Sequence, residues 1–96
     1  MTAPAGYRPA TPAEARAWVR GEVIDIWNSD TRRRYAATVE RWNESGVLVR
    51  VCDPEQVSAA YWPRVALDVF DPDMEDGPSY APRSGDGAWV AVVRDA

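Results

Sequence analysis

The chain has 96 residues, a formal net charge of −4 and a sequence pI near 4.7. This length allows one domain with a small core, and the acidic balance argues against a general nucleic-acid binder, which needs a basic face. Hydrophobic residues make up 46% and charged residues 27% of the chain, so it is expected to fold.

The residue types present exclude most catalytic chemistry. The chain has no histidine and no lysine, and Cys52 is its one cysteine. Zinc sites, Ser-His-Asp triads, Cys-His pairs and Schiff-base lysines therefore lack their essential groups. The chain is predicted not to be an enzyme and to use no cofactor and no metal.

The same composition carries expectations about location and source. A lone cysteine cannot form an intrachain disulfide, and no run approaches the roughly 18 apolar residues of a membrane span. The N-terminal residues lack the charged and apolar regions of a secretion signal. We expect a soluble cytoplasmic protein, and the use of arginine for all 11 basic residues suggests a bacterium with a GC-rich genome.

The first elements in chain order are a flexible arm and a helix. Residues 1–10 are rich in Ala, Pro and Gly and are expected to be flexible. Thr11, Pro12 and Glu14 then form a capping box with proline at the first helical position. This pattern predicts a helix over residues 12–20 that packs through Trp18, within a single domain over residues 11–96.

Strands are predicted next, over residues 22–27, 33–42 and 47–51. The 43–46 connection has Asn first and Gly last, which favours a bulged hairpin with Gly46 in the left-handed conformation. That turn sets Val39 opposite Val49 and gathers an apolar face, from which Trp42 points away. Two readings of Trp27 and Trp42 stay open: Trp18 and the N-terminal helix cover them, or the rings are exposed with arginine as a recognition surface.

In the second half of the chain, the residue pattern predicts a short helical turn after Asp53, a strand over 64–70, a long acidic loop over 71–87 and a last strand over 88–94. The loop is rich in Pro, Gly and Asp and is expected to contribute little to stability. Its acidic run lacks the spacing of a calcium-binding EF-hand loop, because a glycine is missing at the sixth position and a glutamate at the twelfth.

Three consecutive arginines, Arg32 to Arg34, stand out in this acidic chain because aromatic residues flank them. Arginine and tryptophan frequently carry the energy of protein interfaces. The alternative is that the arginines are the solvated outside of a hairpin turn. The residues predicted to bind a partner are Trp27, Arg32, Arg33, Arg34, Tyr35, Trp42, Tyr61 and Trp62.

The stretches GEVIDIWN, YAATVERW and GVLVRVCD together resemble the opening of Tudor-like and Agenet-like domains, within the SH3-like small barrels. The resemblance covers roughly residues 21–70 and concerns strand lengths and aromatic positions. It implies a mainly β fold, a small five-stranded antiparallel barrel, to which this chain adds the predicted N-terminal helix and the long acidic loop as departures from the family. It also implies that a peptide or modified side chain binds between aromatics at the strand ends, here Trp27, Tyr35 and Tyr61 or Trp62.

The leading hypothesis is therefore a non-enzymatic module that binds a protein partner through aromatic and arginine residues of the first two strands. One alternative is a nucleic-acid or nucleoprotein contact through the arginine turn. Another is a small inhibitor from a phage or other mobile element that blocks a host machine. No membrane contact is expected, and the sequence leaves the oligomeric state open.

Overall fold

A computed structural model describes residues 3–71 and 80–95 of the chain. Its elements show a mainly β protein, as predicted, with a short α-helix. In chain order they are β1 Tyr7–Pro9, α1 Pro12–Arg16, β2 Val23–Asn28, β3 Arg33–Trp42, β4 Gly46–Val51, the 3-10 turn η1 Ala59–Tyr61, β5 Arg64–Asp68 and β6 Trp89–Arg94.

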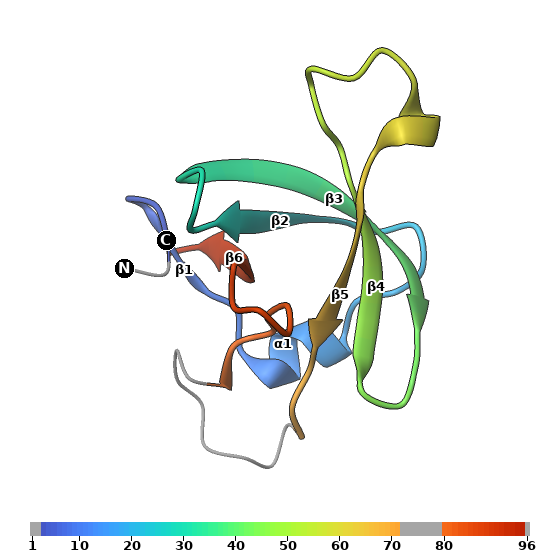
Figure 1. The fold of residues 1–96 in the computed structure, drawn as a ribbon. Helices are drawn as coiled ribbons and strands as arrows, with labels where there is room; N and C mark the ends of the chain where they lie inside the picture. The colour runs from blue at the N-terminus through green and yellow to red at the C-terminus, as the bar shows by residue number, and fades with distance from the viewer. Residues whose placement is uncertain (1–2, 72–79, 96) are drawn as a thin grey trace.

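The strands form one antiparallel six-stranded sheet in the order β1-β6-β2-β3-β4-β5. The sheet curls strongly but is not closed into a barrel (Figure 1). The predicted closed five-stranded barrel is therefore wrong in strand number and in closure. At the open side, β5 and β6 are joined through isolated bridges at Arg83, where a closed barrel would have a continuous ladder.

The predicted flexible arm is also corrected, because residues 7–9 form β1 and pair with β6. Arg8 anchors this strand: its guanidinium donates to both carboxylate oxygens of Glu14, at 2.7 and 2.9 Å. Glu14 is the capping-box residue of α1 and also accepts from the Thr11 amide at 2.9 Å. One glutamate therefore caps the helix and ties the N-terminal strand to it.

The helix begins as predicted but ends early. The capping box of Thr11 and Glu14 is present with Pro12 at the start, and the last helical residue is Arg16, where residue 20 was expected. Trp18 is buried against the main core, whereas Val19, expected on the same helical face, is 64% exposed because the helix has already ended.

The register of the β3–β4 hairpin is confirmed, with Val39 opposite Val49 and Ala37 opposite Val51. Its bulge, however, lies between Val39 and Arg41, and Gly46 does not have a positive φ. Gly46 is needed for a different reason. A Cβ at this position would lie 1.9 Å from the Leu67 carbonyl oxygen, so the glycine lets β4 and β5 approach closely.

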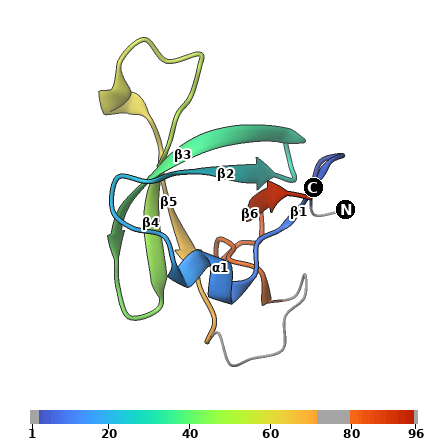
Figure 2. The same ribbon diagram turned by 180° about the vertical axis from the view of Figure 1, so that it is seen from behind.

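The main core fills the concave side of the sheet, with Ile26, Val39, Val49 and Leu67 among its buried residues. In both views α1 lies between the β4–β5 end and the β1–β6 end of the curled sheet, where Ala15 joins this core (Figure 2). A second, smaller cluster lies on the opposite face of β6 and β2, and its members are Ala3, Ala81, Val90 and Val92 with Tyr7 and Trp27 packed against them.

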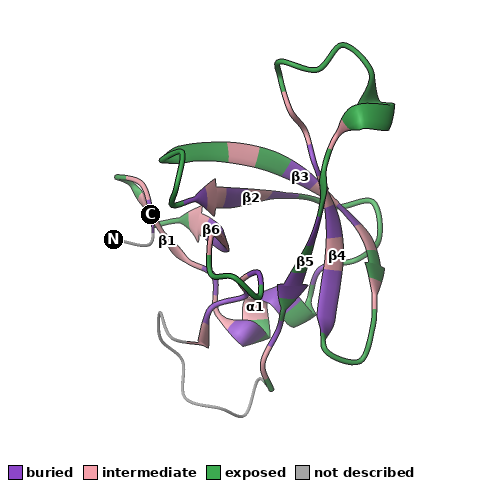
Figure 3. Cartoon of the chain, in the orientation of Figure 1, coloured by how far each residue is buried: buried purple, intermediate pink, exposed green. Residues whose placement is uncertain are grey.

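Two connections differ in their packing. Residues 52–63 project from the sheet, and most of them are exposed (Figure 3). The predicted 71–87 loop is corrected in its second half, since Ala81, Pro82 and Ser84 are buried and Arg83 bridges β5 and β6. The rest of that loop, residues 72–79, lies outside the described residues.

Candidate functional site

The turn that carries the arginines is built by Asn28, whose side chain is buried. Its Oδ1 accepts from the amides of Asp30 and Thr31 at 2.9 and 3.0 Å, and its carbonyl accepts from the Arg32 amide at 2.8 Å. The turn holds Arg32 in the left-handed region with φ at 55°, which costs a non-glycine residue roughly 1 kcal/mol.

The pleat of β3 separates the three arginines. Arg33 shares the concave face with Tyr35, and its guanidinium carbon lies 5.6 Å from the centre of that ring. Tyr35 meets Trp89 edge to face, with 5.3 Å between ring centroids. Arg33 also lies 3.8 Å from a carboxylate oxygen of Glu55. These contacts place Arg33 in an aromatic and acidic neighbourhood of its own chain.

Arg34 lies on the opposite face and pairs across the strands with Trp27. Its guanidinium donates to Asp25 Oδ1 at 2.8 Å and lies 4.9 Å from the centre of the Tyr7 ring. Trp27 packs on the second cluster, and its buried indole N–H has no hydrogen-bond partner among the described residues. The predicted binding residues of β2 and β3 therefore lie on two faces of the sheet.

The remaining predicted residues are far from the turn along the chain. The bulge reverses the side on which Trp42 points, so Trp42 packs against the main core and its indole N–H donates to the Trp18 carbonyl at 3.1 Å. This corrects the expectation that Trp42 points away from the valine face: Trp42 is partly buried beside Trp18 in the main core, whereas Trp27 packs on the second cluster. Tyr61 is 75% exposed on the projecting segment, and the indole N–H of Trp62 is buried without a partner among the described residues.

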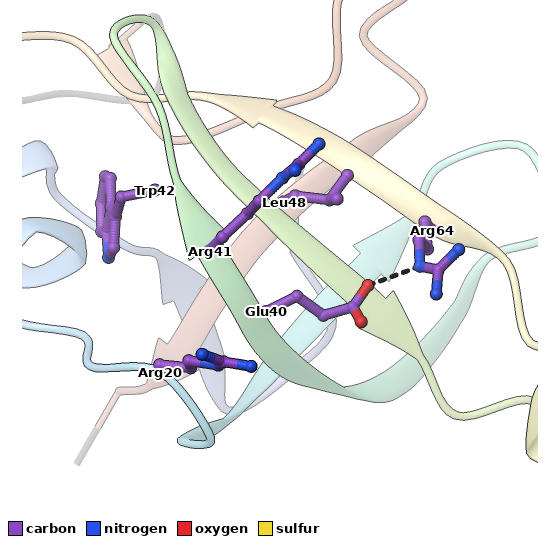
Figure 4. A pocket seen from close by; sticks show the side chains of 6 residues that line it. All are labelled: Arg20, Glu40, Arg41, Trp42, Leu48 and Arg64. Carbon is purple, nitrogen blue, oxygen red and sulfur yellow. Dashed lines mark hydrogen bonds and ion pairs between the residues drawn. The ribbon is translucent and has the colours of Figure 1, made fainter.

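Trp42 and five further side chains line a hollow of about 620 Å³ over β3, β4 and β5 (Figure 4). We call it the arginine hollow. Charged, aromatic and aliphatic groups from four parts of the chain line it: Arg20, Glu40, Arg41, Trp42, Leu48 and Arg64.

The β3 bulge builds this hollow. Because Glu40 is the extra residue, Glu40 and Arg41 both reach the convex face, where strict alternation would have separated them. The loop after α1 is fixed beside them, since the Gly21 amide donates to the Val39 carbonyl at 2.8 Å and the Val39 amide donates to the Glu22 carbonyl at 2.9 Å. These bonds bring Arg20 to the hollow.

The electrostatics of the hollow are unbalanced. Glu40 accepts from Arg64 Nε at 2.7 Å and lies 3.4 Å from Arg50 Nη2, so both of its oxygens are engaged. Arg20 and Arg41 add two exposed guanidinium groups. Arg50 Nε is buried and has no hydrogen-bond partner among the described residues. One carboxylate thus serves two arginines, with Arg20 and Arg41 beside them, in a chain whose net charge is negative.

Sequence reasoning missed the arginine hollow, of whose lining residues it had named Trp42 alone as a binding residue. No local pattern marks it, because Arg20, Arg41 and Arg64 come from a loop and two different strands. The bulge at Glu40 could not be predicted from the hydrophobic alternation, because strict alternation from Val39 would place Arg41 on the valine face.

Other kinds of site find no support in the described ranges 3–71 and 80–95. They contain no group of three or more His, Cys, Asp or Glu side chains placed to hold a metal ion, and no helix long and apolar enough to cross a membrane. Comparison of the chain with protein-family models, curated proteins and solved structures found no match.

Proposed function

We propose that this chain is a non-enzymatic protein-interaction module that binds an acidic segment of a protein partner at the arginine hollow. The observation that carries the proposal is the shared Glu40: its two oxygens serve Arg50 and Arg64, while Arg20 and Arg41 stand beside them. Guanidinium donors exceed carboxylate acceptors at this spot, and an acidic partner would supply the missing acceptors.

The chemistry of the lining favours a carboxylate ligand. Arginine presents a planar fork of donors that matches a carboxylate in two parallel hydrogen bonds. Leu48 and Trp42 add apolar surface, and arginine with tryptophan frequently forms the part of an interface that contributes most to affinity. The position differs from the expected one, since the hollow uses β3, β4 and β5.

The resemblance to SH3-like Tudor-like and Agenet-like domains is part of this proposal. Its support is the strand order of residues 21–70 and the contact between Tyr35 and Trp89 at one end of the curled sheet. The non-enzymatic part rests on the lack of histidine and lysine in the sequence. A cytoplasmic location is proposed from Cys52, which is free and half-buried. An inhibitor of a host machine would be one kind of module with this design.

A nucleic-acid contact is the second candidate, because phosphates also accept from arginine forks. The net charge of −4 disfavours it. The two candidates differ in salt dependence: affinity for a nucleic acid falls steeply with salt as counterions return to the phosphates, whereas an acidic segment that also contacts Leu48 and Trp42 loses less.

The test is binding to an array of acidic, neutral and basic peptides, with two matched double variants. We expect the wild type to select acidic peptides, Arg41→Ser with Arg64→Ser to lose the selection, and Arg32→Ser with Arg33→Ser to keep it. If the turn variant loses the selection and the hollow variant keeps it, the partner site lies at the turn. Single-stranded DNA at several salt concentrations tests the second candidate.

A further inference from the structure

The two edges of the sheet differ in how far their backbone groups are protected. An exposed edge strand offers unpaired N–H and C=O groups to another chain, and proteins usually blunt such edges. The edges here are β1 and β5 (Figure 1). Their hydrogen bonds show which residues of each strand face outward.

The β1 edge is blocked. The Ala10 amide bonds the Ala91 carbonyl of β6, and the Asp95 amide bonds the Gly6 carbonyl, so the outward residues are Tyr7 and Pro9. Proline has no N–H to offer. The Tyr7 N–H already donates to the carbonyl of Pro4 at 3.1 Å.

The β5 edge is open at two residues. The Val51 amide bonds the Pro63 carbonyl and the Val69 amide bonds the Ser45 carbonyl, so residues 63, 65, 67 and 69 bond toward β4. The backbone groups of Arg64, Ala66 and Asp68 therefore point away from β4. Arg83 occupies the place beside Asp68, and the described residues provide no backbone partner for Arg64 or Ala66 on that side.

The chain itself shows that this edge accepts an added strand. The Asp68 amide donates to the Arg83 carbonyl at 2.7 Å, and the Arg83 amide donates back at 3.2 Å, as in an antiparallel ladder. The ladder stops because the chain turns away after Ser84, whose amide bonds the Trp89 carbonyl at 2.9 Å. A Cβ at Gly85 in this turn would have no atom within 4 Å, so the turn is not packed at that point.

We propose that an extended acidic segment of the partner adds to β5 as a further strand, pairing with Ala66 and Arg64. This inference rests on the proposed function and specifies how the acidic segment is held. Main-chain bonds to β5 would supply affinity, and alternate side chains would supply specificity. Side chains of the added strand on the convex face would lie beside Arg64, next to the arginine hollow.

Charge selects the occupant. The convex side of β5 carries Arg64, paired across the ladder with Arg50, and the adjacent hollow adds Arg20 and Arg41. A second copy of this chain at the same edge would bring two such arginine groups together, and like charges on neighbouring strands are destabilising. An acidic strand meets opposite charge. The Ala66 side chain, which pairs with Leu48 across the ladder, is small and exposed, so it leaves space between Leu48 and the added strand.

The test uses a short synthetic peptide of alternating glutamate and threonine, with the intact protein. On binding, amide exchange at Arg64 and Ala66 is expected to slow. Methylating the peptide amides that would face β5 should weaken binding about tenfold or more, because their hydrogen bonds to the β5 carbonyls are lost, whereas methylating the alternate amides should not. Ala66→Pro, which removes an edge N–H and no β4 bond, should weaken binding similarly while the fold is retained.

The outcomes separate the two proposals. Suppose that the peptide binds and that its affinity falls when Arg41 and Arg50 are substituted, but that peptide methylation does not change the affinity and the peptide does not slow amide exchange at Ala66. Strand addition is then wrong and the proposed function stands. If acidic peptides do not bind, or substituting those arginines changes nothing, the proposed function itself is wrong. Slow exchange at Arg64 and Ala66 without peptide, together with a dimer in solution, would overturn the inference by making a second copy the occupant. The inference would also be overturned if single-stranded DNA bound at the arginines of the hollow and the acidic peptide did not slow amide exchange at Arg64 and Ala66.

Discussion

Replacing Gly46 by alanine gives the sharpest test of the close packing of β4 on β5. The added Cβ would lie 1.9 Å from the Leu67 carbonyl oxygen and 3.0 Å from the Asp68 Cα, both of them backbone atoms. The neighbouring strand must therefore shift, because no side chain can rotate away. Overpacking of this kind costs about 1–3 kcal/mol, and the upper end is expected where backbone must move.

For a domain of this size, a loss of about 3 kcal/mol lowers the melting temperature by roughly 12–24 °C. Thermal and urea denaturation measure the loss, and two other glycines serve as controls. Gly85→Ala meets no atom within 4 Å and has no positive φ, so it should change stability by less than about 0.5 kcal/mol. Gly21→Ala also meets nothing but has φ at 89°, so it should cost about 1 kcal/mol through backbone strain alone.

The three variants therefore separate steric overlap from backbone conformation. If Gly46→Ala melts within a degree or two of Gly85→Ala, the close approach of β4 and β5 is not a constraint on the fold. If it loses only as much as Gly21→Ala, β5 moves away from the added Cβ at no more cost than backbone strain, and the steric argument is wrong.

Three further changes test other contacts. Arg32→Gly should stabilise the fold by about 1 kcal/mol, seen as a higher melting temperature, because it relieves the left-handed φ of 55°; no gain would mean that the turn is not strained. The Arg8 guanidinium holds the pKa of Glu14 at about 2, below the ordinary 4.5, so this stabilisation is present above pH 4.5 and lost as the pH falls toward 2. Glu14→Gln should therefore lower the melting temperature near neutral pH, with the difference from wild type shrinking toward pH 2; a constant difference would contradict the ion pair. Trp42→Phe should cost about 1–3 kcal/mol in urea denaturation, since the Trp18 carbonyl loses its donor, and an unchanged midpoint would contradict that contact.

Much of the fold could be predicted from local patterns. The capping box at Thr11 and Glu14 fixed the start of α1, and the alternation around the 43–46 turn fixed the register of Val39 with Val49. Both depend on residues close in sequence. The end of α1 did not follow, because tertiary contacts of Trp18 replace the helical continuation that its spacing favoured.

The errors share a cause in long-range pairing. Residues 7–9 become a strand because β6, more than eighty residues later in the chain, offers its edge and Glu14 holds Arg8. The sheet stays open between β5 and β6, which the described residues join through isolated bridges at Arg83 and not through a ladder. For residues 7–9, neither β6 nor Glu14 can be identified as a partner from the composition of residues 1–10. That segment is rich in Ala and Pro, which predicts a flexible arm.

The candidate site was harder to predict for a geometric reason. A run of three arginines is conspicuous in a sequence, but the pleat sends Arg33 and Arg34 to opposite faces, where each meets groups of its own chain. Arg41 and Arg64 are separated by 23 positions and share one hollow, because the bulge and the β4–β5 ladder bring their strands to one face. Charge density in space therefore differs from charge density along the chain.

Glu40→Gln tests whether Glu40 occupies the position that a partner's carboxylate would share. Glu40 accepts from Arg64 at 2.7 Å and pairs with Arg50, so the change leaves these two guanidinium groups without their shared carboxylate. Glu40 is partly buried, and we expect a modest loss of stability, about 1 kcal/mol by thermal denaturation, as the arginines repel one another.

Binding should change in the opposite direction. With Glu40 neutral, a glutamate-rich peptide meets more positive charge and no internal competitor, so its affinity at low salt should rise several-fold and become more sensitive to salt. Glu44→Gln, an exposed change in the hairpin turn, is the matched control for loss of one negative charge and should have a smaller effect. Weaker binding by Glu40→Gln would show instead that Glu40 orients Arg64 and Arg50 for the partner. The site would then be preorganised by its own carboxylate, and the excess of donors over acceptors would not be what attracts the ligand.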